Sequence, residues 1–279
     1  MKYKLDRKTL EVIYKSYIRP VLEYADIVWD DIPNMWVSEL EKIQLNALRI
    51  ITGLPRGTSH QVIYSESGFS PLCTRRNNHR LSMFYQIVNE TAPPNLLSIA
   101  PKRTDQHIHG LRPRPEFIIP RSRTESFSNS FIPKTTAEWN NLSTIIRQSE
   151  NLATFKSKLP SPIRPPVHYY TCISRKADIL LCRIRNFASG LNSDLYNNHV
   201  NDSPVCACGI IETASHYFLF CPIFNNQRTI MLNSIIQHIP VDLIDINLLL
   251  YGSNQLPLTV NTSIIKNVQT FISSTKRFE

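Results

Sequence analysis

The amino-acid sequence predicts a mainly α-helical protein made of two small helical domains. Apolar residues recur at intervals of three and four along most of the chain, which is typical of helices that bury one face. No long stretch alternates apolar and polar residues, as a half-buried strand would. The chain also has 19 prolines and only 7 glycines, which indicates ordered helices joined by stiff connectors rather than by flexible linkers.

Residues 1–160 are expected to form the first helical domain. Its helices are expected over about 10–25, 37–52 and 71–90, with shorter helical signals within 127–159. Pro20 should kink or split the first of these helices, because proline removes a helical hydrogen bond. Gly53 suits the C-terminal end of the second helix. The stretch 101–123 has little periodicity and is expected to form an exposed basic loop.

A proline-rich stretch marks the expected domain boundary. The segment "PSPIRPPVHYY" carries four prolines in eleven residues, and its part 161–170 is interpreted as a linker. Residues 171–279 then form the second helical domain, with a small hairpin at a cysteine motif. Its helices are expected over about 171–189, 223–239, 242–250 and 260–276.

The net charge of +9 favours a polyanionic partner such as RNA or DNA, bound through its phosphates. A soluble basic surface without a partner is the alternative interpretation. The candidate phosphate contacts are a strip near the start of the third helix and the basic loop. They comprise Arg75, Arg76, Arg80, Lys102, Arg103, Arg112, Arg114, Arg121 and Arg123.

The motif "CACGIIETASHYFLFCP" places Cys206, Cys208, His216 and Cys221 within sixteen residues. Three thiolates and an imidazole suit a tetrahedral Zn²⁺ ion, and four protein ligands would make the site structural rather than catalytic. His216 and Cys221 are five residues apart, about 140° around an ideal helix, so the helix should end or unwind before Cys221. The alternative is a chance cluster of buried thiols with a core histidine.

Other function classes find little support. The sequence has no phosphate-binding glycine loop and no G-x-S-x-G nucleophile motif. Asp30 and Asp31 are paired carboxylates, but they fall in a turn, where aspartate is common. No apolar run is long enough to cross a membrane, and no secretory leader is evident. We therefore expect an intracellular protein of the nucleus or cytoplasm that makes no membrane contact.

Several motifs resemble, in order, the C-terminal region of non-LTR (LINE-type, jockey-like) retrotransposon reverse transcriptase polyproteins. The first is "LEVIYKSYIRPVLEYADIVWDDI", similar to the segment that follows the reverse transcriptase palm in that family. "LEKIQ" with its following helix and "FIPKTTAEWNNL" resemble later parts of the same region. The cysteine motif resembles the zinc knuckle typical of the extreme C-terminal part. Together these motifs cover nearly the whole chain.

This resemblance implies a thumb-like region in 1–160 and a structural zinc knuckle at 206–221. The family's Tyr/Phe-Ala-Asp-Asp box, which holds the catalytic Mg²⁺ ions, is not present in the sequence. We therefore expect a fragment without fingers, palm or endonuclease, which binds a primer–template and has no polymerase activity by itself.

Two alternatives remain open at this point. The first alternative to a nucleic-acid-binding fragment is a degenerate copy. The second is a non-catalytic interaction protein that docks on a reverse transcriptase palm. In the second case an apolar face containing Tyr14, Tyr17 and Trp29 is expected to be exposed. A free-standing enzyme is not expected.

Overall fold

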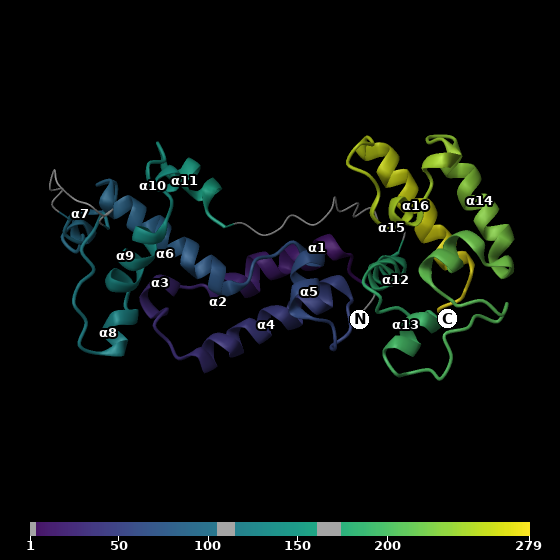
Figure 1. The fold of residues 1–279 in the computed structure, drawn as a ribbon, viewed down its shortest axis with the longest axis horizontal. Coiled ribbons are helices and arrows are strands. Elements are labelled where there is room, and N and C mark those ends of the chain that lie inside the picture. The colour runs from purple at the N-terminus through teal and green to yellow at the C-terminus, as the bar shows by residue number, and fades with distance from the viewer. Residues whose placement is uncertain (1–3, 105–114, 161–173) are drawn as a thin grey trace. The chain divides into compact units, whose positions relative to one another are not determined.

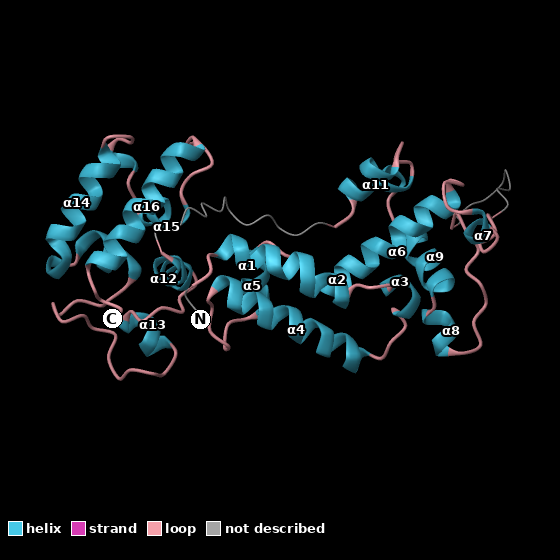
Figure 2. Cartoon of the chain, turned by 180° about the vertical axis from the view of Figure 1, so that it is seen from behind, coloured by secondary structure: helices cyan, strands magenta, loops and turns pink. Residues whose placement is uncertain are grey.

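The computed structural model describes residues 4–104, 115–160 and 174–279, which fold mainly into helices (Figures 1 and 2). No strand lies within these ranges. They contain two isolated antiparallel bridges, Arg103 with Phe117 and Val205 with Ile211. The prediction of a mainly α fold is confirmed.

The described helical elements include α-helices, π-helical turns (η1, η2) and 3₁₀ turns (η3, η4). In chain order they are α1 (Arg7–Ile13), η1 (Tyr14–Ile18), α2 (Arg19–Leu22), α3 (Asp26–Trp29), α4 (Asn34–Thr52), α5 (His60–Ser67), α6 (Leu72–Val88), α7 (Pro94–Leu97), α8 (Glu125–Asn129), α9 (Phe131–Asn141), α10 (Thr144–Arg147), α11 (Leu152–Lys158), α12 (Arg175–Arg185), α13 (Asn192–Asn197), η2 (His216–Phe220), η3 (Pro222–Phe224), α14 (Asn225–Ile236), η4 (Val241–Leu243), α15 (Ile246–Tyr251) and α16 (Leu258–Ser274).

The chain forms two compact units that do not follow the order of the sequence. Unit 1 comprises Met1–Ser16, Leu45–Phe69 and Ile163–Glu279, and unit 2 comprises Tyr17–Gln44 and Ser70–Pro162. This grouping differs from the expected division into 1–160 and 171–279, because two N-terminal segments pack with the C-terminal helices. The expected linker at 161–170 lies outside the described residues.

The core of unit 1 lies between α12, α14, α15 and α16. It includes Leu181, Leu249, Val268 and Phe271, each at most 1% exposed. The carboxyl end of α4 packs against α12 in the same unit. Gly53 ends α4 with φ +78°, and a Cβ atom there would lie 2.5 Å from a side-chain carbon of Ile179. Glycine is therefore required both by the backbone conformation and by the close approach of α12.

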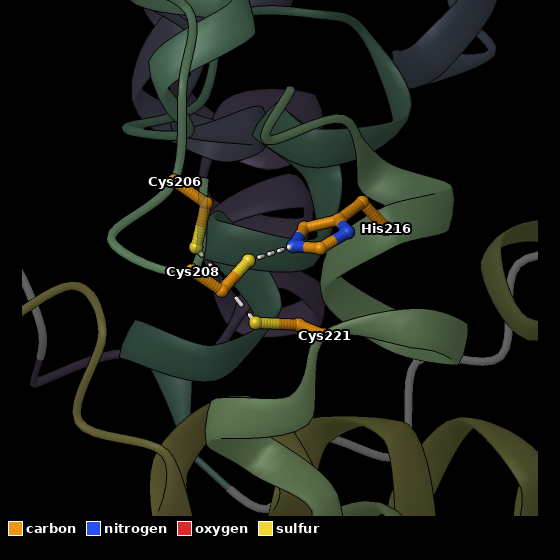
Figure 3. Close-up of side chains that lie close together, drawn as sticks. All are labelled: Cys206, Cys208, His216 and Cys221. Carbon is orange, nitrogen blue, oxygen red and sulfur yellow. Dashed lines mark hydrogen bonds between the residues drawn. The ribbon is translucent and has the colours of Figure 1, made fainter. Parts of the chain in front are cut away.

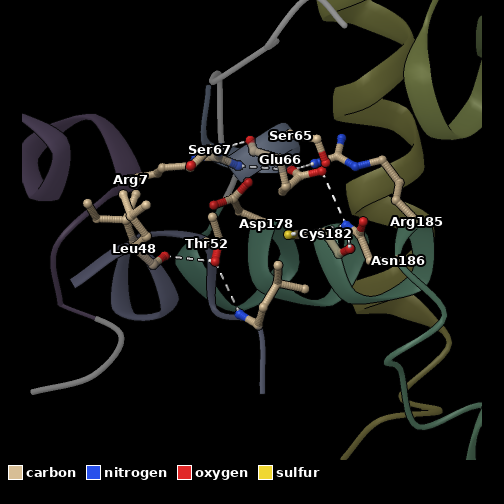
Figure 4. A network of polar contacts seen from close by, with 12 residues as sticks. Arg7, Leu48, Thr52, Ser65, Glu66, Ser67, Asp178, Cys182, Arg185 and Asn186 are labelled. Carbon is tan, nitrogen blue, oxygen red and sulfur yellow. Dashed lines mark hydrogen bonds and ion pairs between the residues drawn. The ribbon is translucent and has the colours of Figure 1, made fainter. Parts of the chain in front are cut away.

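A buried carboxylate joins three helices of unit 1 (Figure 4). Glu66 on α5 accepts hydrogen bonds from Arg7 on α1 at 3.1 Å and from Arg185 on α12 at 2.6 Å. Asn186 donates to its second oxygen at 3.2 Å. Burial raises the pKa of Glu66, but the two guanidinium groups outweigh this effect and hold it below its ordinary value. Burial also raises the pKa of the neighbouring Cys182 thiol to about 12.

Polar contacts to the end of α4 add to this junction. Arg175 donates to the carbonyl oxygens of Ile50 and Ile51 at 2.7 and 2.6 Å, and Arg183 donates to that of Gly53 at 2.8 Å. These carbonyls belong to the last turn of the helix and to the residue after it, where helical partners are missing. Arginines of α12 thus satisfy the end of α4.

The first helix of the chain changes its geometry just before Pro20. α1 passes into the π-helical turn η1, and α2 follows with Pro20 in its first turn. Proline lacks the N–H that would bond to the carbonyl four residues earlier, and the wider turn relieves this conflict. The expected kink therefore takes the form of a π turn. Tyr14, expected on an exposed face, is instead 1% exposed and packs against Phe69.

The core of unit 2 is an aromatic cluster between α6, α9 and α11. Trp139 lies 5.2 Å from Phe84 and 5.6 Å from Phe155 between ring centroids. Tyr85 stacks on Phe155 and donates to the carbonyl of Ser149 at 2.7 Å.

No helix in the described part of the chain is long and apolar enough to span a bilayer.

Candidate metal centre

Four side chains predicted as zinc ligands lie together in unit 1 (Figure 3). The sulfur atoms of Cys206, Cys208 and Cys221 and a ring nitrogen of His216 all lie within 4.8 Å of one another. Two of the thiols come from a short loop, and the other two side chains come from a helical turn. The sequence therefore identified residues that the fold brings into one cluster.

The loop that carries Cys206 and Cys208 is a tight turn closed by the bridge between Val205 and Ile211. The N–H of Cys206 donates to the carbonyl of Ile210 at 2.8 Å, and that of Gly209 donates to the carbonyl of Cys206 at 2.9 Å. Gly209 has φ +90°, a conformation that only glycine adopts readily. The expected hairpin is present in this minimal form.

A π-helical turn, η2, presents His216 and Cys221. The N–H of Cys221 donates to the carbonyl of His216 at 2.7 Å, which closes a five-residue turn instead of the usual four-residue one. An ideal α-helix would separate the two side chains by about 140°. The wider turn brings both onto the same side, and the chain leaves the helix at Cys221 with extended backbone angles. The helix thus unwinds before Cys221, as expected.

The distances within the cluster fit a tetrahedral zinc ion. The sulfurs of Cys206 and Cys221 are 3.7 Å apart, and that of Cys208 is 3.2 Å from Nε2 of His216. When two thiolate sulfurs each lie 2.3 Å from one tetrahedral zinc ion, the sulfurs are about 3.8 Å apart. Small movements of Cys208 and His216 would therefore suffice to place all four ligand atoms around one ion.

Burial shapes the chemistry of these ligands. Cys206, His216 and Cys221 are 6%, 4% and 0% exposed, while Cys208 is only partly buried. Burial raises the pKa of the Cys206 thiol to about 11. A metal binds the thiolate, so loading at neutral pH must release a proton from this residue. A tetrahedral ion held by all four side chains would have no position left for a substrate.

Two buried charged residues hold the ligand segments in place. Arg228 on α14 donates through Nε to the carbonyl of Phe218 at 3.0 Å and through Nη2 to the carbonyl of Cys221. Glu212, 1% exposed, accepts two hydrogen bonds from Arg277, at 2.7 and 2.6 Å, and one from the N–H of Asn192 at 2.8 Å. The first residue fixes the π turn and the second fixes the loop.

The three arginines predicted as phosphate contacts on α6 are engaged within unit 2. Arg75 pairs with Glu23, Arg76 with Asp30 at 2.7 Å, and Arg80 with Glu138 at 2.7 Å. Arg76 and Arg80 are 2% and 4% exposed. The α6 residues therefore do not form an open basic strip. The expected strip is absent because each arginine pairs with an acidic residue that lies far away in the sequence. The local sequence around α6 does not reveal such partners.

The described ends of the basic loop are exposed. Hydrogen bonds from Thr104 to Glu116 and from Ile118 to Lys102, both 2.9 Å, hold the two ends side by side. The guanidinium of Arg103 lies 5.5 Å from the ring centroid of Phe117. The exposed cations here are Lys102, Arg103, Arg121 and Arg123. Arg112 and Arg114 lie outside the described residues.

Comparisons with known proteins give no further indication of the function. Neither the protein-family models, the curated proteins nor the solved structures give a match to this chain. The functional interpretation therefore depends on the sequence motifs and on the geometry of the cluster.

Proposed function

We propose that the Cys206–Cys221 cluster binds one zinc ion whose role is to stabilise unit 1. The observation that carries this proposal is the convergence of three sulfurs and one imidazole nitrogen within 4.8 Å. Thiolate-rich tetrahedral sets favour zinc over the harder divalent cations. The measurement is the metal content of the purified chain, with one zinc per chain expected.

For the whole chain we propose a non-catalytic nucleic-acid-binding role, as the C-terminal part of a non-LTR retrotransposon reverse transcriptase. The ordered sequence motifs and the excess of basic residues support this proposal. The contacts are assigned to the exposed residues Lys102, Arg103, Arg121 and Arg123, whereas Arg75, Arg76 and Arg80 serve mainly internal ion pairs. RNA and DNA are both candidate partners.

The test is binding of a labelled primer–template duplex at increasing salt concentration. Phosphate contacts release counterions, so the logarithm of the affinity should fall linearly with the logarithm of the salt concentration. An absence of binding at low salt, or binding indifferent to salt, would exclude this role. No nucleotide incorporation is expected from the chain alone.

One observation favours a second candidate function, docking to a partner protein such as a polymerase palm. In unit 2, Tyr17, Val21, Tyr24 and Val28 are 74%, 75%, 80% and 83% exposed. They come from η1, α2, the turn after α2 and α3, and several exposed apolar side chains in one segment are typical of a protein-interaction site. These residues include Tyr17 from the predicted face, whereas Tyr14 is buried. A chain that stays monomeric and binds no hydrophobic dye would count against docking.

A further inference from the structure

Unit 2 contains a pocket of about 670 Å³ that is separate from the metal-ligand cluster. Its lining comes from the turn after α3, the start of α4, the first half of α6, the helices α8 and α9, and Pro160. Small-molecule sites in proteins typically occupy about 300–1,000 Å³. The charged residues Asp30, Arg76, Arg80, Lys134 and Glu138 all contribute to the lining.

Three cations share two carboxylates in this pocket. Arg76 and Lys134 bind the two oxygens of Asp30 at 2.7 and 2.9 Å, and Arg80 contacts the same carboxylate. Arg80 also meets both oxygens of Glu138, at 2.7 and 2.8 Å. These five groups therefore leave one positive charge without a matching carboxylate.

The remaining acids of the pocket are at its exposed edge. Asp31 and Glu125 also line the pocket, and both are exposed to solvent. Solvent screens their charges far more strongly than those of buried groups. They do not reach the buried Arg76 and Arg80 in this way, but Asp31 raises the pKa of the partly exposed Lys134 and so offsets part of its charge.

Two buried N–H groups in this cluster have no hydrogen-bond partner in the described structure. They are Nη1 of Arg76 and Nε of Arg80, on side chains that are 2% and 4% exposed. A buried donor on a charged group normally has an acceptor, since leaving it unpaired is costly. Burial, and then repulsion from Arg80 and Arg76, lower the pKa of Lys134. The missing component is thus a hydrogen-bond acceptor.

We propose that this pocket binds a phosphate group, with Arg76, Arg80 and Lys134 as its ligands. A phosphate carries several acceptor oxygens in a tetrahedral arrangement, so it can accept from more than one of these side chains at once. The pocket volume leaves room for an attached nucleoside beside the apolar residues Ile32 and Val37, which also line it. Binding of the phosphate itself is independent of the proposed nucleic-acid role. We further assign the phosphate to the end of a nucleic-acid strand, and this second step rests on that role.

Tryptophan fluorescence provides a direct test, because the guanidinium of Arg76 lies 5.7 Å from the ring centroid of Trp29. Inorganic phosphate at low ionic strength should produce a saturable change in emission that chloride at equal ionic strength does not. Lys134→Met should weaken phosphate binding about ten- to a hundredfold, as expected for a hydrogen bond to a charged group. Lys42→Met is the matched control, because Lys42 is an exposed lysine of unit 2 outside the pocket. It should bind phosphate as the wild type does.

A second variant covers the case in which Lys134→Met does not fold. Arg76→Lys keeps the positive charge but removes Nη1, and it should also weaken binding measured by ³¹P NMR. The proposal fails if the wild type shows no saturable phosphate binding. It also fails if a folded pocket variant binds phosphate as tightly as the Lys42→Met control.

Oligonucleotides then separate the sources of the phosphate. A preference for a 5′-phosphorylated strand over a 5′-hydroxyl strand, lost in Lys134→Met, would assign the pocket to a strand end. Equal binding of the two strands, with phosphate binding intact, would refute the strand-end assignment and leave a free nucleotide as ligand. Salt-dependent strand binding without any phosphate site would refute the pocket but not the proposed function.

Discussion

The N–H of Cys221 donates a hydrogen bond to the carbonyl of His216 at 2.7 Å, five residues earlier in the chain. This π turn brings the imidazole and the thiol to the same side of the segment. Arg228 holds the turn through the carbonyls of Phe218 and Cys221. The positions of the His216 and Cys221 side chains therefore depend on this backbone hydrogen bond and on the contacts of Arg228 with the turn.

We predict that Arg228→Met lowers zinc affinity without removing a ligand. Loss of groups that orient metal ligands typically costs about 10- to 100-fold in affinity. Competition with a chromophoric chelator, on protein shown to be folded by circular dichroism, measures the change. Arg56→Met, at an exposed arginine of the same unit, is the control and should bind zinc normally. Equal affinities for the two variants would contradict this role of Arg228.

We predict that Gly53→Ala destabilises unit 1, whereas Gly57→Ala does not. Alanine at position 53 would adopt φ +78° and approach Ile179 to 2.5 Å, a combination expected to cost about 2–4 kcal/mol. A Cβ atom on Gly57 meets no atom within 4 Å, so its substitution should change stability by less than about 1 kcal/mol. Urea unfolding followed by far-ultraviolet circular dichroism measures both, and equal midpoints would contradict the packing described.

We predict that Glu66 makes unit 1 less stable in acid. Its folded-state pKa lies below the ordinary value of 4.5 because Arg185 and Arg7 outweigh the effect of burial. The stabilisation is therefore fully present above the unfolded-state pKa and is lost as pH falls through the folded-state pKa. The groups around Glu66 also include Asn186, which donates to it, the neutral Cys182 thiol, and Tyr251, whose pKa is raised by burial and by Glu66.

The corresponding variant is Glu66→Gln. It removes the carboxylate that Arg7 and Arg185 share, although Arg7 keeps its pair with Glu11, and should cost about 3–5 kcal/mol at neutral pH. It should also flatten the loss of stability between neutral and acidic pH. Glu39→Gln removes an exposed pair with Lys42 and should cost less than about 1 kcal/mol. A Glu66→Gln chain as stable as Glu39→Gln at pH 7 would rule out this junction.

We predict that the exposed basic residues, rather than the α6 arginines, set the salt dependence of nucleic-acid binding. The double variant Arg121→Gln, Arg123→Gln should reduce the slope of log affinity against log salt by about two, one for each lost phosphate contact. Fluorescence anisotropy of a labelled duplex measures the slope. The charge-matched control is Lys42→Gln, Lys266→Gln, at two exposed lysines outside the loop. An equal reduction in the control would show that only net charge matters.

The sequence predicted the parts of the fold that depend on local periodicity. The third helix, expected over 71–90, is α6 at Leu72–Val88, and the four side chains predicted as zinc ligands lie together. Helix α5 was missed because it is short and weakly amphipathic. Its signals were Ser59, whose hydroxyl accepts from Val62 N–H, and Gly68, whose φ is +71°.

Long-range relations could not be predicted in the same way. Arg76 and Arg80 were interpreted as free cations, and their pairing with Asp30 and Glu138 joins residues 46 to 58 positions apart. Similarly, the contacts of Glu66 with Arg7 and with Arg185 join α1 to α12 within unit 1. Periodicity reports which face of a helix is buried, but not which helix covers it.

The central claim is that Cys206, Cys208, His216 and Cys221 bind zinc and thereby stabilise unit 1. All three tryptophans, Trp29, Trp36 and Trp139, belong to unit 2, so their emission reports that unit separately.

The most direct test is elemental analysis of the wild type, Cys221→Ser and Cys73→Ser, each purified with zinc under reducing conditions. We predict one zinc per chain in the wild type and in Cys73→Ser, whose thiol is exposed and outside the cluster. Cys221→Ser should hold substantially less zinc and lose helical signal while its tryptophan emission is unchanged. A wild type without bound zinc, or a Cys221→Ser chain that retains a full equivalent, would contradict the account.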